Sequence, residues 1–139
     1  MDIEYNIMTE APLEIVATLI EKASYKKTLD EMDYPIFRNK NFIGLRLERT
    51  DEDFFDMYQG ERRDKKEFIE NPKSYLRSDI DNSLMIDEEY LIEEGKLERK
   101  LSKSEMEKQV KNDFESINIS LIKQGYKTDF YETKEGFDI

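Results

Sequence analysis

The chain has 139 residues, a formal net charge of −11 and 40% charged residues, with no cysteine and no histidine. These features exclude a disulfide framework, a thiolate nucleophile, a Ser-His-Asp triad and zinc sites built on Cys or His. The length suits a single domain, and the apolar residues recur at helical and strand spacings, so we expect one folded α+β domain over residues 1–139.

The N-terminal segment gives an expectation about location. Residues 1–10 contain three acidic residues and no basic or apolar signal-peptide region. No apolar run in the sequence is long enough to cross a bilayer. We therefore expect a cytoplasmic protein.

The N-terminal third predicts a strand, a helix and a second strand. Residues 2–8 alternate polar and apolar side chains, which is typical of a half-buried strand. Leu13, Val16, Ala17 and Ile20 recur at helical spacing and predict a core-facing helix, which an apolar stripe continues to Met32. Residues 42–49 alternate again and predict the next strand.

The middle of the chain is predicted to be mainly helical. Thr50 and Asp53 resemble a capping box that starts a short helix ending at Gly60. The charged stretch 61–70 also predicts a helix, whereas 72–82 shows no clear pattern. We interpret residues 51–82 as a segment that could form an inserted helical lobe.

The C-terminal part predicts a hairpin, a long helix and two further strands. Residues 84–92 and 97–101 flank a turn at Gly95. Ser102 and Glu105 form a capping box that starts a long helix. Gly125 is the expected C′ residue of this helix. A strand over 126–133, a turn over 134–136 and a strand over 137–139 complete the prediction. The apolar stripe of the helix consists of Met106, Val110, Phe114, Ile117 and Leu121.

These elements favour an α+β fold with a mixed or antiparallel sheet. Strands and helices do not alternate strictly, which argues against an all-parallel sheet. We expect the long helix of the C-terminal half and the N-terminal helix to pack on one face. The short strand at 137–139 is expected at a sheet edge or in the sheet of a second subunit, so a homodimer is one interpretation.

The acidic residues are concentrated in the centre of the chain. Residues 47–93 hold 15 acidic and 7 basic residues, which is most of the net charge. Adjacent Phe54 and Phe55 cannot both face one core stripe, so one of them is a candidate exposed aromatic beside Tyr58. The predicted partner-binding residues are Asp51, Glu52, Asp53, Phe55, Asp56, Tyr58, Asp79 and Asp81.

This pattern favours a non-enzymatic protein that binds a basic surface. A strongly negative field repels nucleic acid and anionic lipid and attracts basic proteins, including nucleic-acid-binding proteins. We therefore interpret the chain as a small inhibitor or regulator that mimics nucleic acid. The class includes phage anti-defence (anti-CRISPR-like) and immunity proteins. This hypothesis requires no cofactor and no metal.

Two alternatives stay open at this stage. Asp87 on one predicted hairpin strand and Glu98-x-Lys100 on the next resemble the metal site of PD-(D/E)xK nucleases. That resemblance implies a small magnesium-dependent nuclease in which the carboxylates hold the ion and Lys100 orients the attacking water. The second alternative is an oligomer that sequesters a small molecule through its Tyr and Lys residues.

Overall fold

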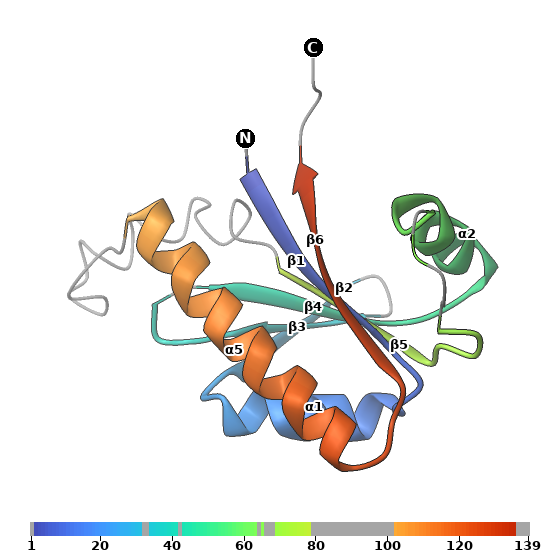
Figure 1. The fold of residues 1–139 in the computed structure, drawn as a ribbon. Coiled ribbons are helices and arrows are strands. Elements are labelled where there is room, and N and C mark those ends of the chain that lie inside the picture. The colour runs from blue at the N-terminus through green and yellow to red at the C-terminus, as the bar shows by residue number, and fades with distance from the viewer. Residues whose placement is uncertain are drawn as a thin grey trace.

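The computed structural model describes residues 2–31, 34–41, 43–63, 65, 69–78 and 102–135. Their strands form one antiparallel sheet in the order β2-β3-β4-β5-β1-β6 (Figure 1). The strands are β1 (Asp2–Thr9), β2 (Lys26–Glu31), β3 (Tyr34–Arg38), β4 (Gly44–Arg49), β5 (Ser74–Ser78) and β6 (Thr128–Glu135). The helices are α1 (Leu13–Lys22), α2 (Glu52–Glu61) and α5 (Lys103–Lys123). The predicted α+β class is confirmed.

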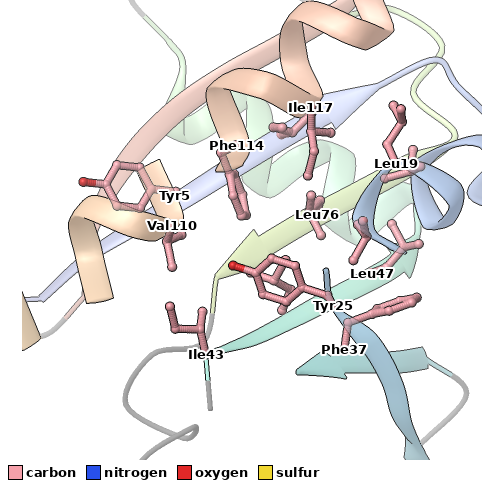
Figure 2. Packing of buried hydrophobic residues seen from close by; sticks show 14 of the residues in the cluster. Tyr5, Leu19, Tyr25, Phe37, Ile43, Leu47, Leu76, Val110, Phe114 and Ile117 are labelled. Carbon is pink, nitrogen blue, oxygen red and sulfur yellow. The ribbon is translucent and has the colours of Figure 1, made fainter. Parts of the chain in front are cut away.

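The main hydrophobic core lies between the sheet and the pair α1 and α5. Strand alternation sends Tyr5, Leu47 and Leu76 to this side of the sheet, which we call the helix face. Figure 2 shows Phe114 and Ile117 of α5 directed at these strand residues. The ring centroids of Tyr5 and Phe114 are 6.3 Å apart, within the range of favourable aromatic pairs. The predicted packing of both helices on one face is therefore confirmed.

The N-terminal helix is shorter than predicted. It ends at Lys22, and Ser24 takes the left-handed conformation with φ of 72°. The amide of Ser24 donates to the carbonyl of Glu21, and the amide of Tyr25 donates to Ile20. These two bonds form a Schellman motif, which reverses the chain so that residues from Lys26 on pair with β3. The predicted continuation to Met32 is wrong because Leu29 fits a strand as well as a helix.

The long helix agrees with the prediction at both ends. Ser102 caps it, and the reciprocal capping box with Glu105 is present. Gly125 has φ of 90°, and its amide donates to Ile122 while the amide of Tyr126 donates to Leu121. Gly125 is thus the C′ residue of a second Schellman motif.

Besides β2, two further strands of the sheet were not predicted. β3 lies between β2 and β4, and β5 lies between β4 and β1 at the centre of the sheet. The buried Ser74 and Ser78 hide the pattern of β5, because serine reads as polar. The Ser74 hydroxyl donates to the carbonyl of Ala11, and the Ser78 hydroxyl accepts from the amide of Tyr5. Tertiary hydrogen bonds thus satisfy both buried hydroxyls.

Several local predictions are corrected. The cap of α2 is Asp51, whose side chain accepts from the amide of Phe54, and not Thr50. Helix α2 ends at Glu61 with Arg62 as its C-cap, so the described residues 62, 63, 65, 69 and 70 of the predicted helix over 61–70 are not helical. Lys134 and Glu135 belong to β6 and not to a turn. The hairpin predicted at 84–101 and the strand at 137–139 lie outside the described residues. No helix in the described ranges is long and apolar enough to span a membrane.

Candidate functional site

The sheet face opposite α1 and α5 is polar, and we call it the polar face. The register places Glu48 of β4 beside Tyr75 of β5, Tyr75 beside Met8 of β1, and Met8 beside Asp129 of β6. Helix α2 lies on this side of the sheet, away from α1 (Figure 1). The residues of the polar face are Glu4, Asn6, Met8, Arg46, Glu48, Tyr75, Arg77, Asp129, Tyr131 and Thr133.

Aromatic side chains attach α2 to the polar face. The ring of Phe54 lies 5.7 Å from that of Tyr75, and the ring of Tyr58 lies 5.8 Å from that of Tyr131. Phe55 packs against Tyr58 at 6.3 Å. Both phenylalanines are half-buried, and Tyr58 is fully buried with 0% exposure. The expected exposed aromatic beside Tyr58 is therefore corrected: Tyr58 anchors α2 and presents no surface to a partner.

A buried carboxylate holds the C-terminal end of α2. Asp129 is 3% exposed and accepts hydrogen bonds from the Tyr58 hydroxyl at 2.9 Å and from Arg62 at 3.1 and 3.2 Å. The Tyr58 hydroxyl and Arg62 Nε donate to Oδ2, and a second Arg62 nitrogen donates to Oδ1. The Nζ of Lys65 lies 2.7 Å from Oδ1 of Asp129. The Tyr58 oxygen in turn accepts from the amide of Ile69 at 3.1 Å. Each oxygen of the carboxylate thus has two partners, which compensates for its burial.

Protonation of Tyr58 supports this arrangement. Burial and the negative charge of Asp129 together raise the pKa of Tyr58 to about 12, while the hydrogen bond from the amide of Ile69 opposes the rise. The hydroxyl therefore stays protonated at neutral pH and donates to Asp129. Arg62 also lies over the ring of Tyr131, at 5.0 Å from its centroid. Helix α2 is consequently held by both packing and charge.

A second polar group crosses the middle of the polar face. The Tyr75 hydroxyl donates to Oδ1 of Asn6 at 2.6 Å, and Arg77 Nε lies 2.9 Å from the carboxylate of Glu4. Burial raises the pKa of Glu48, while the charges of Arg77 and Arg46 oppose the rise. These contacts are internal to the sheet, so we assign them a structural role.

The outward side of α2 carries the predicted acidic residues. Glu52, Asp53 and Asp56 are exposed, as is the N-cap Asp51. No cation of the described part of the chain forms an ion pair with any of these four carboxylates. We call Asp51, Glu52, Asp53 and Asp56 the α2 acidic face. Met57 lies beside it with 37% of its surface exposed.

The remaining predicted site residues are not placed. Asp79 and Asp81, and the nuclease candidates Asp87, Glu98 and Lys100, lie outside the described residues. Within the described part, no group of three or more acidic side chains could hold a metal ion. A cavity of about 270 Å³ opens beside the N-terminus of α1, and its described lining includes Glu14, Arg49 and Lys73.

Sequence reasoning missed the residues that position the acidic helix. Asp129 and Tyr131 alternate with Phe130 in β6, so their shared face was readable from the sequence. Their contact with Tyr58 was not readable, because 71 residues separate Tyr58 from Asp129. Comparison with protein-family models, curated proteins and solved structures finds no match to this chain.

Proposed function

We propose that this protein is a non-enzymatic binding factor that docks the α2 acidic face on a basic surface of another protein. The supporting observation is a helix that is firmly attached on one side and carries four exposed carboxylates on the other. A nucleic-acid-binding protein is the kind of partner that such a charge pattern favours, since its binding groove is basic.

The anchoring of α2 favours binding because the acidic residues are held in place before a partner arrives. Tyr58 and Asp129 fix the helix, so docking would order few further degrees of freedom. The net charge of −11 adds long-range attraction toward a basic partner and raises the rate of encounter.

The spacing of the acidic residues is unfavourable for the free protein. Asp56 follows Asp53 by three positions and Glu52 by four, so like charges are neighbours on the helix surface. Each such pair costs a helix about 0.2–0.5 kcal/mol. A cationic partner relieves this repulsion. A surface selected only for the stability of the free protein would avoid such like-charge neighbours, so their presence favours a binding role.

The experiment is capture of partners from cell lysate, eluted by increasing salt. The test variant is Asp51→Asn, Glu52→Gln, Asp53→Asn, Asp56→Asn, in which Asn keeps the capping function of residue 51. The matched control removes four exposed charges elsewhere, by Glu14→Gln, Glu21→Gln, Glu70→Gln and Glu115→Gln.

We expect that the wild type and the control variant both capture one basic protein and that the α2 variant does not. Equal retention by both variants would remove the α2 acidic face from the account. Circular dichroism of both variants checks that neither charge change unfolds the domain.

A further inference from the structure

The outward side of α5 exposes two neighbouring isoleucines. Ile119 is 52% exposed and Ile122 is 55% exposed, whereas the apolar stripe on the inward side of the helix is buried in the core. The described residues have one further exposed large hydrophobic side chain, Met57 on α2. Residues three positions apart are neighbours on a helix surface, so Ile119 and Ile122 form one patch, which we call the isoleucine patch.

Opposite charges flank the isoleucine patch. Glu115 precedes Ile119 by four positions and Lys123 follows it by four, so these three side chains form one ridge along the helix. Both charged side chains are exposed, and neither forms an ion pair within the described residues. The ridge therefore has an acidic end, an apolar centre and a basic end.

This ridge is complementary to itself when it is reversed. A two-fold axis beside Ile119 places the ridge of a second copy antiparallel to the first, so that Glu115 of each copy faces Lys123 of the other. Ile119 then packs against the partner's Ile119. Ile122 lies on the adjacent ridge and flanks the same groove. Ridges of this four-residue spacing interdigitate at about −50°, which is the commonest packing class of helix pairs.

We propose that α5 pairs with α5 of a second copy of this chain through the isoleucine patch and the two facing charge pairs. The interface is isologous, because the same residues of both copies meet across the axis. The inclined crossing limits the contact to residues around Ile119, so the other charges of the two helices diverge. Helix α2 lies on the opposite side of the sheet (Figure 1) and stays accessible in the pair, so this inference is independent of the α2 acidic face.

The small contact area sets the strength of the pair. A single helix crossing buries less than the roughly 1,000 Å² of a stable interface, so we expect a dissociation constant on the order of 0.1–1 mM. The net charge of −11 on each copy opposes association. At about 0.15 M salt the screening length is about 8 Å, which reduces this long-range repulsion and preserves the facing charge pairs. In dilute samples the chain is monomeric, and Glu115 is then an ordinary surface charge.

Sedimentation equilibrium at about 0.15 M salt and up to about 1 mM protein tests the proposal. The wild type is expected to show a monomer–dimer equilibrium. Glu115→Lys and Lys123→Glu each bring like charges face to face, so each variant should be monomeric. Mixing the two variants should restore a heterodimer, and combining both changes in one chain should restore the homodimer. An effect on folding alone would give neither rescue.

The matched control is Lys108→Glu, which changes the net charge as Lys123→Glu does. Lys108 is an exposed residue of α5 about two turns before Glu115, so the control should associate as the wild type does. Ile119→Gln should weaken association by about tenfold or more, because both copies lose apolar burial. Circular dichroism checks that each variant is folded.

Two results would overturn the proposal. The first is a wild type that stays monomeric at the highest concentration. The second is a dimer that persists in Glu115→Lys, Lys123→Glu and Ile119→Gln, because the interface then lies elsewhere on the molecule.

Discussion

The residue at the left-handed position after each core helix decides part of the stability of that turn. Both α1 and α5 end in Schellman motifs, but the position is held by Ser24 in the first and by Gly125 in the second. A side chain with a Cβ atom is strained at positive φ, whereas glycine is not. The turn after α1 is therefore not at its stability optimum.

Replacing Ser24 by Gly should stabilise the protein by about 0.5–1 kcal/mol, since the strain is relieved and the Ser24 side chain makes no hydrogen bond within the described residues. Urea denaturation measures the change. The matched control is Gly125→Ser, which should destabilise by a similar amount. Space around Gly125 is open, so that cost is purely conformational. Equal stability of all three proteins would contradict the argument.

The hydroxyl of Tyr58 is the second residue-scale test. Tyr58→Phe keeps the ring packed but leaves the amide of Ile69 without its acceptor and Asp129 without one donor. Loss of about 1–3 kcal/mol of unfolding free energy is expected. Tyr126→Phe is the control, because no hydrogen bond of its hydroxyl is found within the described residues. A loss no larger than that of the control would show that the bond is dispensable.

The raised pKa of the buried Glu48 predicts a pH dependence of the protein's stability. Its pKa is raised above the ordinary 4.5 by burial, so between pH 4.5 and the raised value the folded state binds more protons than the unfolded state. The contribution of Glu48 to unfolding free energy therefore falls as pH rises through this window. The stability of Glu48→Gln relative to wild type should increase from about pH 4 to about pH 7.

Thermal melts across this range measure the effect, with Glu115→Gln on the exposed side of α5 as the control for loss of one charge. A difference between wild type and Glu48→Gln that does not change with pH would mean that Glu48 ionises as freely in the folded protein as in the unfolded chain.

At the scale of elements, strongly periodic segments were predictable and short strands were not. The stripe of α5 and the alternation of β1 are local properties of the sequence, and both predictions are confirmed. Leu29 fits both a helical and a strand period, so the sequence pattern predicts a continuation of α1 where the structure has β2. β5 has serines facing the core, which only tertiary hydrogen bonds make tolerable.

A substitution in helix α2 is expected to change stability and partner binding in opposite directions. Asp56→Lys should stabilise the free protein by about 0.5–1 kcal/mol, because repulsion by Glu52 and Asp53 becomes attraction at the same spacing. The same change should weaken binding to a basic partner. Asp56→Asn is the intermediate control. Denaturation and binding are measured on the same samples, and a variant that gains stability and also binds more tightly would contradict the proposed role of α2.

At the scale of the whole molecule, the candidate site depends on contacts that the sequence does not show. The acidic residues of α2 were recognised from composition and spacing, and Glu52, Asp53 and Asp56 are exposed as expected. The burial of Tyr58 was not recognised, because its partners Asp129 and Tyr131 come from β6 at the far end of the chain. Local patterns thus predicted the charge of the helix but not how it is attached.

The most direct test of the account is retention on immobilised poly-L-lysine during a salt gradient. Wild type is compared with the four-charge α2 variant and with the four-charge control at Glu14, Glu21, Glu70 and Glu115, both of which lose the same net charge. The account predicts that the α2 variant elutes at clearly lower salt than the control. Identical elution of the two variants would mean that only net charge matters and would contradict a binding role for the α2 acidic face.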